Sequence, residues 1–195
     1  MARLAESTGV PTVLLDFLDA GPNVDTIGVE HDRGTREIVR HLQERDHHRI
    51  AFIGGAIALS PAARRLDGYL KSVPERDRTD MLLGNFTMEW GHDAGSQLDL
   101  GLGTTAVVCA NDLVAYGLLQ WAQEADIDVP GQLAVTGFDD LPYSAVTTPP
   151  LTTVNQPIGE LAEGTLELLT QRVDQPDLPK REVRFHGQVI IRSST

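Results

Sequence analysis

Three apolar stretches of the sequence, each long enough for a strand, end in side chains that can bind a polar ligand. They are Asp16 after residues 12–15, Asn111-Asp112 after residues 104–110, and Asp139-Asp140 after residues 133–138. Carboxylates accept hydrogen bonds, and an asparagine amide both accepts and donates them. Because ligands of open parallel α/β sheets bind just outside the carboxyl ends of the strands, this repetition predicts a small-molecule site.

Asn111 and Asp112 also have a purely structural interpretation. Apolar residues follow them at helical spacing, namely Val114, Leu118, Trp121, Ala122 and Ala125. Asparagine and aspartate are favoured N-cap residues, so one of the two is expected to cap this helix. A cap alone would explain the pair, but the acidic residues at the other two strand ends favour a binding site.

Two further side chains are expected close to the strand ends. A helix that begins at Ser60-Pro61 places Arg64 and Arg65 in its first turns, where a guanidinium can bind a ligand oxygen in a forked manner. Phe86 follows a weak strand at residues 81–83. Its ring can pack in the core or stack on a ring of the ligand, and both interpretations remain open at this point.

Catalytic and metal chemistry find little support in the sequence. The one cysteine, Cys109, lies within an apolar stretch and is expected to be buried, without a disulfide. His41, His47 and His48 have no cysteine or carboxylate partner at a ligand spacing, so no metal or other cofactor is predicted. The glycines Gly54-Gly55 after a strand do not continue into a G-x-G-x-x-G motif and predict a tight turn.

Composition and charge narrow the class of protein. The 195 residues are 41% hydrophobic and 23% charged, as is usual for a globular domain, and the net charge is −12. The 16 basic residues are scattered, so we expect no DNA binding by this chain alone. No apolar run is long enough to cross a bilayer, and the first residues lack the apolar core of a signal peptide, so a cytoplasmic location is expected.

Strand-like and helix-like segments alternate along the chain. Strands are expected at 12–15, 26–29, 49–53, 81–83, 104–110, 133–138, 152–154, 183–185 and 189–191. Helices are expected at 34–45, 60–73, 87–98, 112–125 and from 157 to about 169, and the end of another at 3–8. This alternation is typical of parallel βαβ units.

Eight motifs, in this order and spacing, resemble those of bacterial LacI/GalR transcription regulators. They are Pro11–Asp16, His48–Gly55, Arg65–Tyr69, Thr105–Asp112, Val129-Pro130, Gly137–Asp140, Pro150–Val154 and Ile191–Ser194. The match covers essentially the whole chain, although Asp46 stands where the family usually has glycine. The resemblance implies a periplasmic-binding-protein-like type I fold, an α/β architecture of two Rossmann-like lobes of parallel sheet flanked by helices and joined by three crossovers.

The resemblance also implies a division of the chain into lobes. Residues 1–47 and 151–174 are expected to be the remnant of an incomplete N-terminal lobe, and residues 48–150 and 175–195 a complete C-terminal lobe. The helix-turn-helix headpiece that binds DNA in the family is expected to be absent. With two β-α units missing, the strand at 12–15 is expected to have an unpaired edge.

By the same resemblance, Asp16, Arg65, Asn111 and Asp139 are expected to contact an effector, with Phe86 as a stacking or wall residue. The effector is expected to be a sugar or sugar phosphate, and the polar side chains are expected to be partly solvated. The function implied is effector sensing in a repressor-type regulator, a homodimer that would reach operator DNA only through the absent headpiece, with no membrane partner. The alternatives are a solute-binding protein of a sugar transporter, disfavoured without a signal sequence, and a sugar-processing enzyme, disfavoured without a nucleophile and its base.

Overall fold

The computed structural model describes residues 10–17, 24–56, 58 and 60–195 of the chain. The chain divides into two compact units. Unit 1 comprises residues 1–30 and 157–187, and unit 2 comprises residues 31–156 and 188–195. The chain therefore passes between the units three times, at residues 30/31, 156/157 and 187/188.

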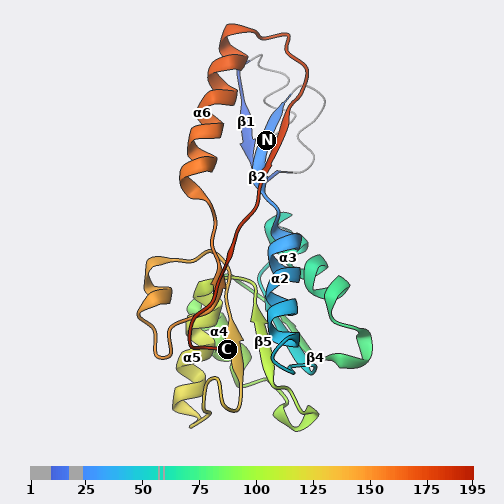
Figure 1. Cartoon of the computed structure of the whole chain (residues 1–195), viewed down its shortest axis with the longest axis vertical. Coiled ribbons are helices and arrows are strands. Elements are labelled where there is room, and N and C mark those ends of the chain that lie inside the picture. Colours follow the sequence, from blue (N-terminus) through green and yellow to red (C-terminus); the bar gives the residue numbers. More distant parts are fainter. Residues whose placement is uncertain (1–9, 18–23, 57, 59) are drawn as a thin grey trace. The chain divides into compact units, whose positions relative to one another are not determined.

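Unit 2 is built on a parallel four-stranded sheet in the order β4-β3-β5-β6 (Figure 1). The strands are β3 (Ile50–Gly54), β4 (Arg78–Leu83), β5 (Ala106–Cys109) and β6 (Ala134–Thr136). The helices are α2 (His31–Gln43), α3 (Ser60–Ser72), α4 (Met88–Gly95) and α5 (Asp112–Glu124), and three short 3-10 turns are η1 (Glu75–Asp77), η2 (Leu100–Leu102) and η3 (Pro142–Ala145). The expected βα alternation of this region is confirmed.

Helices cover both faces of this sheet, and successive strand residues point to opposite sides, so every residue of β3 and β5 is buried. Ile50 and Phe52 of β3 pack with residues of α2 and α3, such as Ile38 and Tyr69. Residues of β3 on the other face, Ala51 and Ile53, pack with α4 and α5. The uninterrupted apolar sequence of β3 and β5 follows from this double cover.

The outer edge of β6 is covered by two segments, one at Thr152 and one at Ser194. Thr136 forms a parallel bridge with Thr152, and the Val135 amide donates to the Ser194 carbonyl at 2.9 Å. The strand β7 (Thr153–Val154) then pairs antiparallel with β9 (Val189–Ile190).

Unit 1 contains a parallel three-stranded sheet in the order β1-β2-β8, with one long helix packed on it. Its elements are β1 (Val13–Leu15), β2 (Asp25–Val29), α6 (Ile158–Asp174) and β8 (Glu182–Phe185). Leu161 and Leu168 of α6 are buried against Ile27 and Val29. Among the described residues β1 pairs on one side only, and Leu15 at its end is 51% exposed.

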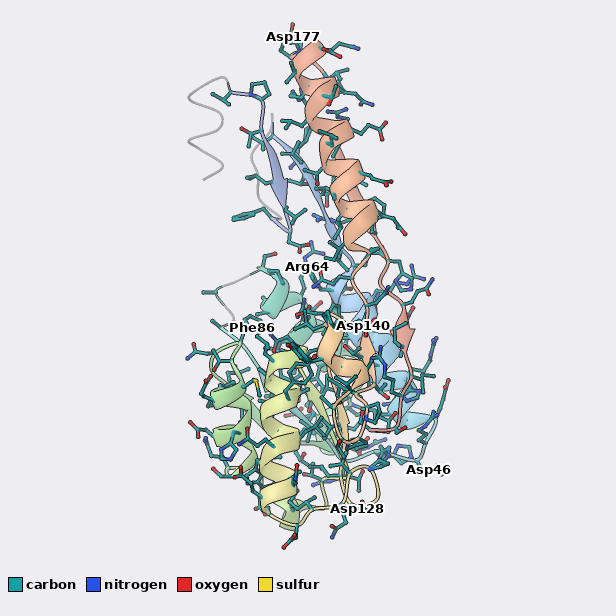
Figure 2. The ribbon with its side chains drawn as sticks, turned by 90° about the vertical axis from the view of Figure 1, so that its left-hand side faces the viewer. Asp46, Arg64, Phe86, Asp128, Asp140 and Asp177 are labelled. Atoms are coloured by element: carbon teal, nitrogen blue, oxygen red, sulfur yellow. The ribbon has the colours of Figure 1, made fainter. Side chains whose placement is uncertain are left out.

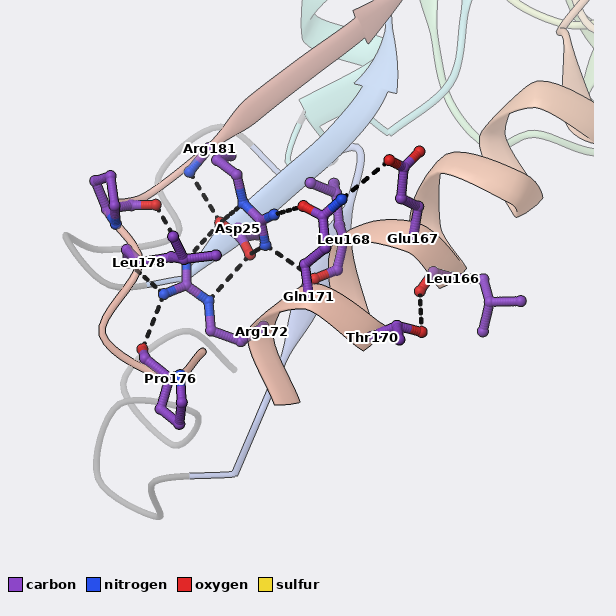
Figure 3. A network of polar contacts seen from close by, with 11 residues as sticks. Asp25, Leu166, Glu167, Leu168, Thr170, Gln171, Arg172, Pro176, Leu178 and Arg181 are labelled. Carbon is purple, nitrogen blue, oxygen red and sulfur yellow. Dashed lines mark hydrogen bonds and ion pairs between the residues drawn. The ribbon is translucent and has the colours of Figure 1, made fainter. Parts of the chain in front are cut away.

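A buried ion network ties α6 to the sheet of unit 1 (Figure 3). The carboxylate of Asp25 is fully buried and pairs with Arg172 Nη2 at 2.7 Å and Arg181 Nη2 at 2.6 Å. Arg172 also donates to the carbonyls of Pro176, Leu178 and Pro179. Burial alone would raise the pKa of Asp25, but hydrogen bonds from the two arginines outweigh it and lower the pKa to about 2.

The observed units differ from the lobe boundaries expected from the sequence, which were 1–47 with 151–174 and 48–150 with 175–195. The helix α2 belongs to unit 2, because Ile38, Val39 and Leu42 pack on its sheet. Residues 151–156 also belong to unit 2, whereas β8 pairs with β2 and belongs to unit 1. The helix expected at residues 3–8 lies outside the described residues.

The described residues include no helix that is both long and apolar enough to span a membrane.

Candidate functional site

The carboxyl edge of the unit 2 sheet carries most of the side chains expected to bind a ligand. Figure 2 shows Arg64, Phe86 and Asp140 toward one end of unit 2, with Asp46 and Asp128 at the opposite end. β4, β5 and β6 are followed at this edge by Phe86, Asn111 and Asp139, and Arg65 comes from α3. Parallel strands end at the same edge, and the fold therefore gathers these residues.

Asn111 caps α5 and is buried, with 6% of its surface exposed. Its Oδ1 accepts a hydrogen bond from the Val114 amide at 3.0 Å. The expected cap is therefore confirmed and is Asn111, while Asp112 is the first residue of the helix. The cap uses one lone pair of Oδ1, so Asn111 can offer a ligand its amide nitrogen as a donor and the second lone pair of Oδ1 as an acceptor.

Arg65 is buried rather than partly solvated, with 4% exposure. Its Nη2 donates to Asp139 Oδ1 at 2.9 Å, and its Nη1 donates to the carbonyl of Ala110 at 2.5 Å. The guanidinium carbon lies 3.9 Å from the centroid of the Phe138 ring. Such a cation–π contact and a charge-assisted hydrogen bond fix the orientation of the guanidinium.

Asp139 is held in an unusual backbone conformation. Its φ of 119° lies in a region that side chains other than glycine rarely adopt. Its amide donates to the Val154 carbonyl at 2.8 Å, and its Oδ1 accepts from Gln156 Nε2 at 2.6 Å as well as from Arg65. The side chain of Asp139 is 20% exposed, and several independent contacts hold its carboxylate at this edge.

Phe86 packs against the glycine that follows β3. A Cβ atom on Gly55 would lie 2.5 Å from the Phe86 ring, and the ring adjoins the apolar cluster of α2, α3 and the sheet. A side chain at position 55 would therefore collide with the Phe86 ring, which is a packing reason for glycine at this position. Phe86 is partly exposed, and its expected role as a wall residue remains a proposal.

Asp16 lies in unit 1, at the carboxyl end of β1. Its φ is 57°, and its Oδ1 accepts from the Val29 amide at 3.0 Å. A Cβ atom on Gly28 would lie 2.4 Å from this Oδ1, so glycine is needed for the carboxylate to approach β2. The structure therefore joins Arg65 to Asp139 and holds Arg65 on the residue before Asn111. It places Phe86 after β4 in the same unit and Asp16 in the other unit.

Three residues in this cluster were not expected from the sequence. His31 Nδ1 accepts from Arg65 Nε at 3.3 Å, Phe138 lies under the guanidinium, and Gln156 donates to Asp139. Gln156 follows the strand at 152–154 as Asn111 follows its own strand, so the same rule could have found it. It was not expected in this cluster because residues 151–174 were expected to belong to the other lobe.

Two acidic residues of the same edge are committed to structural contacts. Asp112 is fully buried and accepts from the Leu141 amide at 2.7 Å and from the Ser144 and Thr153 hydroxyls at 2.6 Å each. Burial raises its pKa to about 6, although these hydrogen bonds oppose the shift. Asp140 pairs with Arg192 at 2.7 Å.

The donors and acceptors at this edge suit a ligand with several hydroxyl groups. A carboxylate accepts, a guanidinium donates, and an amide nitrogen donates, which together match vicinal diols. Among the described residues no group of three or more histidine, cysteine or acidic side chains is arranged to hold a metal ion. Fold and site define the class as an α/β domain with polar side chains gathered at the carboxyl edge of a parallel sheet.

Comparisons with known proteins extend this assignment. A family model described as a periplasmic binding protein-like domain matches residues 39–195. An uncharacterized HTH-type transcriptional regulator of Streptomyces limosus is 33% identical over 201 residues, which cover 100% of this chain and 57% of that protein. A LacI family transcriptional regulator from Enterococcus faecalis V583, solved with bound ribose, has a TM-score of 0.91 at 26% identity, covering 99% of this chain and 71% of that one.

The Lac repressor dimer, solved with operator and the anti-inducer ONPF, has a TM-score of 0.88 at 28% identity, covering 100% of this chain and 69% of that one. The chain therefore belongs to the periplasmic binding protein-like domain family, in the form found in LacI family transcriptional regulators. It spans 56–57% of the length of the first curated relatives that it matches.

Proposed function

We propose that this chain is the effector-sensing part of a LacI-type transcriptional regulator and that its effector is a sugar or sugar phosphate. The observation that carries the proposal is the Arg65–Asp139 ion pair beside the Asn111 cap, at the carboxyl edge of a parallel sheet. The bound ribose of the Enterococcus faecalis relative supports the ligand class. We propose Arg65, Asn111, Asp139 and Asp16 as polar ligand contacts and Phe86 as a wall residue.

The wider role belongs to the same proposal. The relatives that this chain matches are regulators, which supports signalling by ligand binding rather than catalysis. The Lac repressor is a dimer bound to operator, which supports homodimerisation and a DNA-binding headpiece outside these 195 residues. The proposal includes a cytoplasmic location and an N-terminal lobe of which unit 1 is only a part.

Calorimetry with D-ribose, hexoses and sugar phosphates tests the ligand class and the site together. Arg65→Lys and Asp139→Asn each remove a charge-assisted hydrogen bond, worth about 1.5–3 kcal/mol, so affinity should fall roughly 10- to 150-fold. Asp140→Asn is the matched control, because Asp140 is adjacent but pairs with Arg192. Unchanged affinity in both site variants, or no binding of any sugar or sugar phosphate, would contradict the proposal.

A further inference from the structure

At each of the three points where the chain passes between the units, a nearby residue is connected by hydrogen bonds or a β-bridge to the Arg65–Asp139 ion pair. The passages occur at 30/31, 156/157 and 187/188. In unit 2 the residues beside them are His31, Gln156 and Gln188. Each is connected to Arg65 or Asp139 directly or through one neighbouring residue.

The first passage is connected through His31, the first residue of α2. Its Nδ1 accepts from Arg65 Nε at 3.3 Å, and its ring centroid is 5.5 Å from that of Phe138. His31 is 2% exposed, so its ring position is set by this packing. The start of α2 is therefore held against the guanidinium.

The second passage is connected through Gln156, the last residue of unit 2 before α6. Its Nε2 donates to Asp139 Oδ1 at 2.6 Å, the same oxygen that accepts from Arg65 at 2.9 Å. The Asp139 amide also donates to the Val154 carbonyl, two residues earlier in the same segment. Both the backbone and the side chain of Asp139 thus hold this passage.

The third passage is connected through Asn155. The Gln188 amide donates to Asn155 Oδ1 at 2.7 Å, and the Asn155 amide donates to the Gln188 carbonyl at 2.9 Å. Asn155 itself forms a parallel bridge with Asp139. The returning chain is thereby fixed to the outgoing one beside the same carboxylate.

We infer that the Arg65–Asp139 pair is a joint that holds all three connections, and that Gln156 and His31 are positioning residues through which a bound ligand acts on them. The inference rests on the proposed function in assuming a ligand at this pair. A carboxylate oxygen has two lone pairs, and both of those on Asp139 Oδ1 face donors, Gln156 and Arg65. A diol that hydrogen-bonds to both Arg65 and this oxygen must displace Gln156 or Arg65 from the oxygen. The passage held by the displaced residue then becomes more mobile.

The joint can be tested on the whole chain without ligand, by amide hydrogen exchange at Asn155 and Gln188. Asp139→Asn preserves size and tolerance of positive φ but removes the charge, and should accelerate exchange at both amides about fivefold or more. Asp140→Asn, which removes the neighbouring pair with Arg192, should change them less than about twofold. Equal rates in Asp139→Asn and wild type, or equal acceleration by both substitutions, would overturn the inference.

A second arm uses D-ribose as the probe. Ribose at saturation should change exchange at Asn155 and Gln188 by at least about threefold in the wild type, and this change should disappear in saturated Gln156→Ala. Ribose that binds without altering these amides would show that a ligand uses Asp139 Oδ2 alone and would overturn the coupling. If ribose does not bind, a sugar or sugar phosphate that binds in the calorimetry replaces it as the probe. If none of them binds, the ligand class of the proposed function fails, and the ligand-free measurement alone decides whether the joint exists.

Discussion

At the scale of single residues, the carboxylate of Asp112 is fully buried and accepts three hydrogen bonds from uncharged groups. Its three donors are one amide and two hydroxyls, and its hydroxyl partner Ser144 also contacts Tyr116 at 2.7 Å. The carboxylate therefore connects α5 to η3 and β7 without a counter-charge. Burial raises its pKa to about 6 from the ordinary value of 3.8 for an aspartate.

The raised pKa predicts a pH-dependent cost of folding. Since the folded protein binds this proton more tightly than the unfolded chain, stability from this group is fully present below pH 4. As pH rises through 6 this contribution is lost, and the free energy of unfolding falls by at most about 3 kcal/mol. In Asp112→Asn this component vanishes, so the difference in unfolding free energy between wild type and variant should change between pH 4 and 7. Parallel urea-denaturation profiles across that range would contradict the prediction.

The sequence could identify Arg65, Asn111 and Asp139 as neighbours because strand ends and first helical turns are readable from local patterns. It could not show that Arg65 is buried, since that depends on Phe138 and His31, which arrive from distant parts of the chain. The expectation that these polar groups are partly solvated was wrong for Arg65 and Asn111. Side-chain burial is a tertiary property and leaves no local signal.

At the scale of elements, two helices offer matched N-caps. Asn111 caps α5, and Thr87 caps α4 by accepting from the Trp90 amide at 3.2 Å. Asn111→Ala and Thr87→Ala should each lower the unfolding free energy by about 1 kcal/mol, and Asn111→Asp should largely preserve it. Under the proposed function only the Asn111 variants should also weaken sugar binding. Denaturation combined with calorimetry checks this, and an equal loss of binding in Thr87→Ala would contradict it.

The network around Asp25 governs the attachment of α6. Asp25→Ala leaves Arg172, 6% exposed, without its counter-charge and should destabilise unit 1 by about 3–5 kcal/mol. Hydrogen exchange should accelerate in α6 while α5 in unit 2 changes little, and equal acceleration in both helices would contradict the assignment.

The same network predicts sensitivity to acid. Because the folded pKa of Asp25 is lowered to about 2, its contribution of about 2 kcal/mol is present above pH 4 and is lost as pH falls through 2. In wild type, α6 should therefore lose protection more steeply than α5 on acidification. Asp25→Ala should abolish that difference in steepness, and its persistence in the variant would contradict this origin.

Helix and strand positions were predictable to within a few residues, but their allocation to units was not. The apolar stripe of α2, Ile38, Val39 and Leu42, is compatible with packing on either sheet. The strand at 182–185 could likewise pair in either unit until its register with β2 was known. Periodicity identifies which face of an element is buried and says nothing of its partner.

At the scale of the whole molecule, the net charge of −12 sets the expected behaviour toward nucleic acid. Anionic proteins gain nothing from counterion release on a phosphate backbone, so this chain should not retard duplex DNA in a gel-shift assay at physiological salt. A longer chain carrying a helix-turn-helix headpiece is the positive control. Sequence-specific retardation by these 195 residues alone would place DNA recognition within them and contradict the proposed headpiece outside them.

The last two residues complete the sheet of unit 2. Ser194 is fully buried, its hydroxyl donates to the Val135 carbonyl at 2.6 Å, and its carbonyl accepts from the Val135 amide. Thr195 contacts both His41 and Thr152 at 2.9 Å. The two Ser194 contacts occupy the backbone amide and carbonyl of Val135 in β6, which an edge strand would otherwise present to other molecules. A change that displaced Ser194 would therefore expose the amide and carbonyl of Val135, and a well-behaved domain would gain a short adhesive edge that is prone to aggregation.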